Sequence, residues 1–430
     1  MDSGAQLART CLLFQVDLGL SDPAVVLRAL TTLNIVIVAD QETVNSLSGQ
    51  VAVTTGAMLM ARSGHKVFID APDAPLIGDQ PPMTGATLYD AISSVGNQLI
   101  DGVEIAIGCP VFEPHITFVC GQPGPYTQSK SNRIVSVGWT DWSGEFRDWP
   151  MSTQCSGGDW PMGAMAAAVL MASEAIKVAG RMLAALADHG GHLGEVFANC
   201  RTARLSLAPE GTPHAVELGR LDIVSAGAVS NAFLYALLRL PNIRGAARVF
   251  DRDVSDDTNR NRNMLLIAAL AALTKVDLFK HFENGLQVEP IRRHFEKTDV
   301  SNLANVVAVG VDDIPIRWML AGAPAQWMGV GATSHFNSMA SMHVPYAGCA
   351  ACLHPHDEPQ VGATPTIAFV SFLSGLMMAA DLIREIGGAE SCKASRQRYL
   401  TSLQVAGDYS APVAPRSDCP AKCAASRLCA

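Results

Sequence analysis

A run of polar and charged side chains follows a short hydrophobic segment in the second half of the chain. The segment 246–250 has the composition of a strand, and Asp251 comes directly after it. Asn259 and Arg262 follow, and Lys275 comes after a stretch in which we expect one helix. A carboxylate at a strand end can accept both hydroxyls of a ribose, while arginine forks and a lysine match phosphate oxygens. The run therefore predicts a nucleotide site, and the alternative is a solvated, charged loop.

The residues before this run predict a βαβ unit. A buried strand is expected over 221–224, a turn of small residues over 225–231, a helix over 232–240 and the second strand over 246–250. The turn then lies at the carboxyl end of the first strand, where open α/β sheets bind ligands. The helix that follows offers free N–H groups to an anion. Only Gly227 stands where a dinucleotide loop usually has three glycines.

Four of these residues resemble the adenylation motif of ubiquitin-activating enzymes and of the thiamin- and molybdopterin-pathway adenylyltransferases: Asp251, Asn259, Arg262 and Lys275. The segment 307–313 resembles the strand that carries the magnesium-binding aspartate of that family, which would be Asp312. The resemblance covers residues 217–430, with the motifs in the same order. It implies an ATP site in which Asp251 holds the ribose, Arg262, Lys275 and Asn259 hold phosphate oxygens, and Asp312 holds Mg²⁺.

Two cysteine pairs resemble the zinc site of the same family: Cys349 with Cys352, and Cys419 with Cys423. Four thiolates satisfy a closed tetrahedral zinc site, which contributes folding energy rather than catalysis. The second pair has three intervening residues instead of two, and Cys429 is a substitute ligand. A redox pair or unliganded thiols are the alternatives.

The first half of the chain repeats the plan of the second half in a blunted form. The segments 34–40 and 65–70 resemble the two strands around the predicted site, and 51–62 is the expected helix between them. After Asp70 there is no Asn-x-x-Arg and no downstream lysine, and the first half contains no Cys-x-x-Cys. A tandem duplication explains this pattern, and two unrelated Rossmann-like domains would also produce it.

The repeat resembles the eukaryotic ubiquitin-activating arrangement, in which an inactive adenylation domain is paired with an active one. It implies an α/β protein of two tandem Rossmann-like domains that form an intramolecular pseudo-dimer. We expect the inactive domain over 1–205, a linker rich in Pro, Gly and Ser over 206–216, and the active domain over 217–430. In this family the inactive half lends an arginine to the triphosphate, and Arg9 is the candidate. A further homodimer of the chain is left open.

Composition narrows the functional class. A formal net charge of −9 and the absence of a basic stripe argue against nucleic-acid binding. The amino terminus lacks the pattern of a signal peptide, and eleven cysteines in 430 residues are not a disulfide framework. Two apolar segments, 162–183 and 363–380, approach the length of a membrane span, but we expect both to be buried helices. The expectation is a cytoplasmic protein without a membrane segment.

The implied reaction is ATP-dependent adenylation of the C-terminal glycine of a small ubiquitin-like protein, in a bacterial conjugation pathway. The activated carrier would pass to a partner resembling a ubiquitin-conjugating enzyme. The loop 353–360 after the first cysteine pair contains no cysteine for a thioester. Cys392, beside a lysine that could lower its pKa, is the remaining candidate. The alternatives are a catalytically inactive zinc-bearing scaffold and, with less support, an NAD-dependent oxidoreductase.

Overall fold

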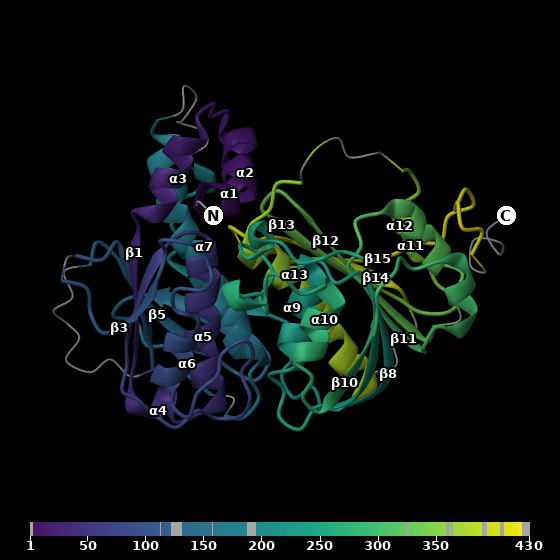
Figure 1. The fold of residues 1–430 in the computed structure, drawn as a ribbon, viewed down its shortest axis with the longest axis horizontal. Helices are drawn as coiled ribbons and strands as arrows, with labels where there is room; N and C mark the ends of the chain where they lie inside the picture. The colour runs from purple at the N-terminus through teal and green to yellow at the C-terminus, as the bar shows by residue number, and fades with distance from the viewer. Residues whose placement is uncertain are drawn as a thin grey trace.

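The protein consists of two α/β halves, each built around a mostly parallel sheet (Figure 1). The computed structural model describes residues 3–111, 113–121, 131–156, 158–186, 195–323, 325–357, 362, 364–388, 394–404 and 408–423. Cys392 and Cys429 lie outside these described residues.

The first half begins with three helices and continues as a seven-stranded sheet. Its elements are α1 (Ser3–Gln6), α2 (Ala8–Leu18), α3 (Pro23–Thr31), β1 (Asn34–Ala39), α4 (Gln41–Val44), α5 (Leu47–Arg62), β2 (Lys66–Asp70), α6 (Leu88–Val95), β3 (Ile105–Ile107), β4 (Ile116–Cys120), β5 (Ile134–Trp139), β6 (Ser143–Asp148), α7 (Met162–Ala184) and β7 (Thr202–Ser206). The strand order is β3-β2-β1-β4-β5-β6-β7. The first five strands are parallel, and β6 and β7 are antiparallel to their neighbours.

The second half forms an eight-stranded sheet in the order β10-β9-β8-β11-β12-β13-β14-β15. The strands β8 to β12 run parallel, and β13, β14 and β15 are antiparallel. Its elements are β8 (Glu217–Val224), α9 (Ala228–Leu237), β9 (Arg244–Phe250), η1 (Asp257–Asn259), η2 (Ala268–Leu270), α10 (Lys275–His281), β10 (Leu286–Ile291), η3 (Lys297–Asn302), β11 (Val306–Val309), α11 (Ile314–Leu320), β12 (Trp327–Ser334), β13 (Asn337–His343), α12 (Ala350–Leu353), α13 (Ala368–Ile386), β14 (Arg396–Thr401) and β15 (Asp408–Pro412).

The two sheets share one topology. Over seven strands the order of the first sheet reproduces that of the second, with β1 in the place of β8, β2 in the place of β9 and β4 in the place of β11. The α/β class predicted from the sequence is confirmed, and both sheets have the parallel arrangement of Rossmann-like folds. The segment 207–216 joins β7 to β8, where the linker is predicted.

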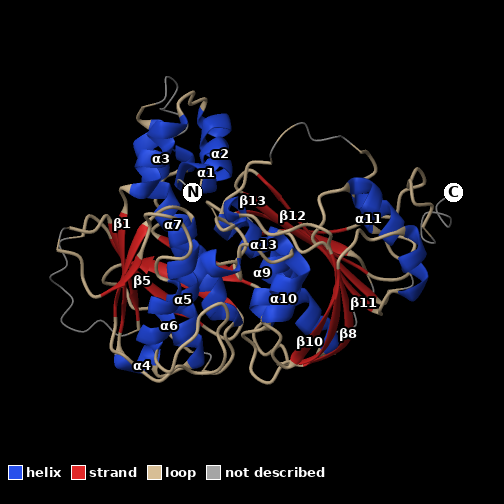
Figure 2. Cartoon of the chain, viewed as in Figure 1, coloured by secondary structure: helices blue, strands red, loops and turns tan. Residues whose placement is uncertain are grey.

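Helices α5, α7, α9 and α13 pack against one another between the two sheets (Figures 1 and 2). In the described part of the chain, α7 is long and apolar enough to cross a membrane, and α2 with α3 passes the same test only as a pair bent by 113°. In α7, 94% of the apolar window is buried inside the fold. Helix α13, which contains most of the second apolar segment, is buried from Ala368 to Ile383 and packs against α7 and α9. Both predicted buried helices therefore form the core between the halves.

Candidate nucleotide and metal sites

Three of the predicted site residues follow the carboxyl ends of neighbouring strands: Gly227 after β8, Asp251 after β9 and Asp312 after β11. The chain leaves β8 through α9 to β9 on one side, and later returns to β11 on the other side. Strand order therefore reverses between β8 and β11, and such a switch point is where open α/β sheets bind ligands. Three loops meet there: 225–227 after β8, 251–256 after β9 and 310–313 after β11.

The turn after β8 has the backbone of a glycine turn although it begins with a serine. Ser225 has a φ of +74°, a left-handed conformation that costs a residue with a Cβ about 1–2 kcal/mol. Its Oγ accepts a hydrogen bond of 3.2 Å from the amide of Gly227. Gly227 is the N-cap of α9, whose first amides have no acceptor within the helix. The turn thus presents a helix amino terminus to the site, as predicted.

Asp251 fixes this turn. Its Oδ2 accepts from the amide of Ala226 at 2.8 Å, and its Oδ1 accepts from the amide of Asp253 at 2.9 Å. A carboxylate has about four lone-pair positions, so each oxygen keeps one for a ribose hydroxyl. Asp251 therefore holds the turn that precedes α9 and keeps acceptor capacity on both oxygens.

We expect Asp251→Ala to weaken ATP binding by one to two orders of magnitude. Hydrogen bonds to a charged group contribute about 1.5–3 kcal/mol, and the variant loses those to the ribose together with the anchor of Ala226. The dissociation constant for ATP, measured by isothermal calorimetry, checks this result. Glu289→Ala, which removes an exposed carboxylate on β10, is the control and should leave the constant within about threefold. Equal affinities for Asp251→Ala and the unmodified protein would contradict the assignment.

An ion pair with Asp253 holds Lys275 at the loop that follows β9. Thr274 caps α10 by accepting from the amide of Asp277 at 3.2 Å, which places Lys275 at the first residue of that helix. Its Nζ donates to Oδ2 of Asp253 at 2.6 Å. This hydrogen bond lowers the pKa of Asp253, so that carboxyl group stays ionised at neutral pH. The structure therefore brings Lys275 to the loop that Asp251 begins.

One local prediction was wrong. No α-helix separates Arg262 from Lys275, because residues 260–274 form turns and the single 3-10 turn η2. Carbonyl groups of this segment bond to the first half of the chain instead of to amides four residues ahead. The guanidinium of Arg62 bonds three of them, a contact that a helix would not allow.

Arg262 lies in this segment, at the boundary between the halves. Its side chain is 8% exposed and donates from Nη1 to the carbonyl oxygen of Thr258 and to Oδ1 of Asn261, each at 2.7 Å. Burial and the nearby guanidinium of Arg9 lower the pKa of Arg262 to about 10. The structure therefore brings together Arg9, from α2 of the first half, and Arg262. Within the described residues neither forms an ion pair with a carboxylate.

Asn259 precedes Arg262 by three residues and shapes the same loop. Its carbonyl oxygen accepts from the amides of Arg262 at 3.1 Å and Asn263 at 2.9 Å. Across the described part of the chain its side-chain amide has no hydrogen-bond partner in the protein, and it remains available to a phosphate oxygen.

The two aspartates in the loop after β11 have different contacts. Oδ1 of Asp313 accepts from the amide of Ile316 at 2.9 Å and caps α11, whereas Asp312 is exposed and has no capping contact. The buried side chain of Arg317 donates to the carbonyl oxygen of Val311 at 3.0 and 2.7 Å, and its charge is close to both aspartates. Of the two carboxylates, Asp312 is therefore the one free to bind a cation.

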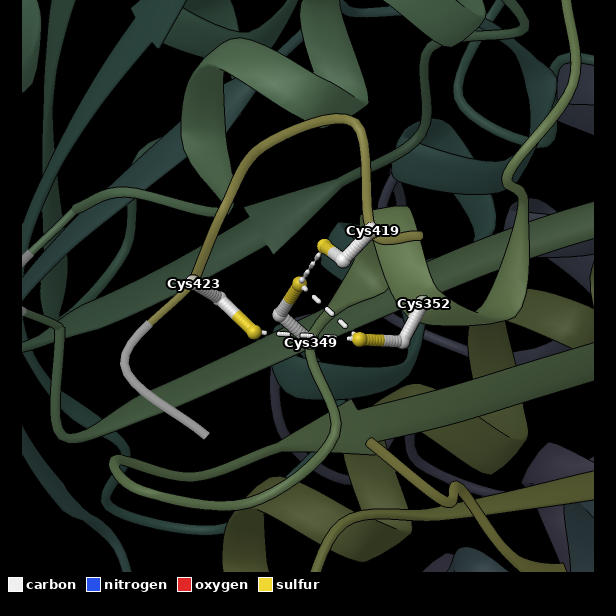
Figure 3. Close-up of side chains that lie close together, drawn as sticks. All are labelled: Cys349, Cys352, Cys419 and Cys423. Carbon is white, nitrogen blue, oxygen red and sulfur yellow. Dashed lines mark hydrogen bonds between the residues drawn. The ribbon is translucent and has the colours of Figure 1, made fainter. Parts of the chain in front are cut away.

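The four predicted cysteines converge in one buried cluster (Figure 3). Cys349 precedes α12 and Cys352 lies in it, while Cys419 and Cys423 come from the segment after β15. Their sulfur atoms all lie within 4.8 Å of one another. The three shortest separations, 3.6, 3.7 and 3.7 Å, match the edge of about 3.8 Å that a tetrahedron with Zn–S bonds of about 2.3 Å requires. The residues therefore fit a zinc ion.

The corresponding crevice of the first half carries carboxylates instead of arginines. Asp40 follows β1 and caps α4, and Asp70 ends β2. A Cβ on Gly121, at the end of β4, would lie 2.6 Å from a carboxylate oxygen of Asp40 and 2.4 Å from the hydroxyl of Thr43. Asp40 and Thr43 therefore pack tightly against the end of β4, and the charge of the aspartates is of the wrong sign for a triphosphate.

Parts of the chain are similar to known proteins. Residues 34–191 match the family model of the BilD N-terminal domain. Among solved structures, Escherichia coli MccB with ATP is similar at 16% identity and a TM-score of 0.40, over 48% of this chain and 67% of that chain. PaaA is similar at 12% identity and a TM-score of 0.36, over 46% of this chain and 65% of that chain. No curated protein matches the sequence significantly.

Proposed function

We propose that the protein adenylates the C-terminal carboxylate of a small ubiquitin-like protein. The observation that carries the proposal is the pair of Arg9 and Arg262, which come from opposite halves and repel each other beside the loop of Asp251 and Lys275. The nearby carboxylate of Asp256 offsets only part of the charge of these two cations, and a polyanion would neutralise the rest. A nucleoside triphosphate, with its ribose on Asp251, satisfies both requirements.

In the proposed reaction a carboxylate oxygen of the carrier forms a bond to the α-phosphorus of ATP, and the bond to pyrophosphate breaks. The carboxylate of the carrier and the triphosphate are both negatively charged, so catalysis consists of positioning the two groups and neutralising their charge. Asp251 orients the nucleoside, and Arg9, Arg262, Lys275 and Asn259 bind phosphate oxygens. Asp312 would hold Mg²⁺, which neutralises phosphate charge.

The two halves have different roles in this proposal. The first half, over 1–205, contributes Arg9 and no nucleotide site of its own, while the second half, over 217–430, contains the nucleotide and zinc sites. The two halves of one chain then form an intramolecular pseudo-dimer, which takes the place of a dimer of two identical subunits. Within this proposal the protein acts in the cytoplasm and needs no further homodimer to complete its site.

Delivery of the activated carrier is the second part of the proposal. The acceptor is a partner resembling a ubiquitin-conjugating enzyme, which takes the carrier from the adenylate or from a thioester on Cys392. Intact mass spectrometry after incubation with ATP and carrier distinguishes the two routes. A carrier-sized adduct that hydroxylamine removes and that Cys392→Ser abolishes identifies the thioester route.

A second function, a zinc-bearing scaffold without catalysis, is favoured by one observation. Ser230 follows the turn after β8, and its buried Oγ has no hydrogen-bond partner. A Cβ on Gly310 would lie 2.2 Å from this oxygen. Ser230 therefore packs tightly against the loop after β11, and close phosphate approach depends on the space that remains.

Pyrophosphate exchange with Asp312→Ala separates the two functions. We expect carrier- and Mg²⁺-dependent exchange in the unmodified protein, and a loss of about 10²–10³-fold in the variant, as for removal of one group that stabilises transition-state charge. Asp313→Ser is the matched control, because serine retains the cap of α11 but removes the neighbouring charge. Absence of exchange with every carrier in the folded, zinc-loaded protein would favour the scaffold.

A further inference from the structure

The segment that carries Arg262 is an irregular loop inside the molecule. Residues 260–266 are all buried, and they form only turns. Loops usually cover the surface, because buried backbone groups need hydrogen-bond partners. The carbonyl groups of this segment therefore have to be satisfied by something other than water or a helix.

Arg62, the last residue of α5 in the first half, supplies three of these partners. Its guanidinium is 0% exposed, and it donates from Nη1 to the carbonyl oxygen of Arg260. From Nη2 it donates to the carbonyl oxygens of Met264 at 3.0 Å and Leu266 at 2.9 Å. One rigid fork thus joins both ends of the segment that contains Arg262. A planar guanidinium suits such a role, because its donors are fixed in direction.

Three further hydrogen bonds to the first half hold the same segment. Arg260 donates to the carbonyl oxygen of Gln98 at 3.0 Å and to Oδ1 of Asp101 at 2.8 Å. The side-chain amide of Asn261 donates to the hydroxyl of Thr10 at 3.2 Å. Thr10 is the neighbour of Arg9 on α2. Contacts from the first half therefore surround Arg262, and the same helix carries the arginine that faces it.

The charge of Arg62 argues against a purely structural role. Within the described residues the guanidinium has no carboxylate partner, and burial, together with nearby Arg260, lowers the pKa of Arg62 to about 9. A buried cation that lacks a counter-ion is costly, and an apolar side chain of similar volume is often as stable or more stable. An arginine at this position therefore has a role other than filling space in the core.

We propose that Arg62 is a positioning residue for the phosphate-binding loop, so that the inactive half sets the conformation in which Arg262 meets the triphosphate. This inference rests on the proposed function for its consequence, but its structural part is independent of that function. It gives the first half a task besides the contribution of Arg9. The loop is also bonded within its own half, where Oδ1 of Asn231 accepts from the amide of Leu265 at 2.7 Å, and Arg62 adds the contacts that fix its carbonyl groups.

Arg239 offers a matched control. It is also a buried arginine, 2% exposed, and it crosses the same boundary by donating to the carbonyl oxygen of Pro81 at 2.8 Å. Its second bond goes to the carbonyl oxygen of Tyr235 within α9, not to the segment around Arg262. Arg62→Met and Arg239→Met therefore each remove one buried guanidinium from the interface, and only the first change affects the loop.

Hydrogen exchange tests the positioning without any ligand. In the full-length protein we expect the amides of 260–266 to exchange at least tenfold faster in Arg62→Met, and to remain protected in Arg239→Met. Arg62→Lys retains the charge but cannot span three carbonyl groups, so it should behave like Arg62→Met. Equal exchange in the Arg62 and Arg239 variants would overturn the proposal.

Kinetics test the consequence. Arg62→Met and Arg62→Lys should raise the KM for ATP by about tenfold or more and leave the KM for the carrier unchanged. In the Arg262→Ala background the same changes should have no further effect, because Arg62 acts through Arg262. Multiplicative losses there would overturn the proposal. The two proposals can also be separated. If the Arg62 variants speed hydrogen exchange in 260–266 but the unmodified protein neither binds ATP nor exchanges pyrophosphate, Arg62 positions the loop and the proposed function is wrong.

Discussion

Arg262→Ala is expected to slow carrier-dependent pyrophosphate exchange by about 10²–10³-fold, the loss that follows removal of one donor to developing charge in a preorganised site. Arg262 is buried and held by Thr258 and Asn261, so its guanidinium does not reorganise when the substrate arrives. A preorganised cation in a dry site stabilises a phosphate more strongly than a mobile one in water. The exchange rate at saturating ATP and carrier measures this effect.

Arg9 should act on the same charge from the opposite half. Because Arg9 is one of the groups that lower the pKa of Arg262, an anion placed between them relieves their repulsion and gains from both. We expect Arg9→Ala to slow exchange by about tenfold or more, and the double variant to lose less than the product of the single losses. Arg28→Ala, on the neighbouring α3, is exposed and should have no effect. Exchange unchanged in Arg9→Ala would show that the first half contributes no phosphate ligand.

The sequence predicted the frame of this site because local patterns determine it. Short apolar runs ended by Asp251 and by Asp312 place both carboxylates at the carboxyl edge of a parallel sheet, and the structure has them there. The repeat was predicted from similar local patterns, and the two sheets share the same strand order. Residues within a few positions of one another determine both features.

The remaining features depend on contacts between distant residues. Arg62 is the last residue of the helix predicted over 51–62, and nothing nearby in the sequence indicates that it bonds to a segment about two hundred positions away. The prediction of a helix before Lys275 was wrong for the same reason. Contacts with distant residues outweighed local helix propensity. Ser225 replaces a glycine but keeps a left-handed backbone, which composition alone cannot indicate.

Removal of zinc is expected to unfold the carboxyl-terminal cluster and to slow the reaction. The four cysteines pack only with one another and with Val413, Trp318, Ala321 and other nearby apolar side chains, so without the metal this cluster has little apolar area to hold it. Zinc supplies about 10–16 kcal/mol of apparent folding energy to isolated fingers. We expect Cys349→Ser to release about one zinc equivalent and to lower the melting temperature by several degrees or more. Cys155→Ser, in the first half, should do neither.

Loss of zinc should also disturb the position of Asp312, through α11. The indole of Trp318 donates to the carbonyl oxygen of His354 at 2.7 Å, and Nη1 of Arg317 lies 3.2 Å from its ring, so the residue after α12 anchors the helix that follows the aspartates. A loosened cluster should therefore raise the Mg²⁺ concentration needed for exchange. Retained zinc content in Cys349→Ser, or an unchanged Mg²⁺ dependence after complete zinc loss, would contradict this coupling.

The pH dependence of zinc affinity has a defined sign. Burial, together with the other cysteines nearby, raises the pKa of Cys349 and of Cys352 in the metal-free protein. Zinc binds thiolates, so binding at neutral pH must release protons, and affinity falls as the pH is lowered. Competition with a chromophoric chelator between pH 8 and pH 6 should show a steep loss, while the pyrophosphate-exchange site, with its always-charged arginines, changes little over that range. A pH-independent zinc affinity would show that binding displaces no thiol protons, and would contradict the four-thiolate site.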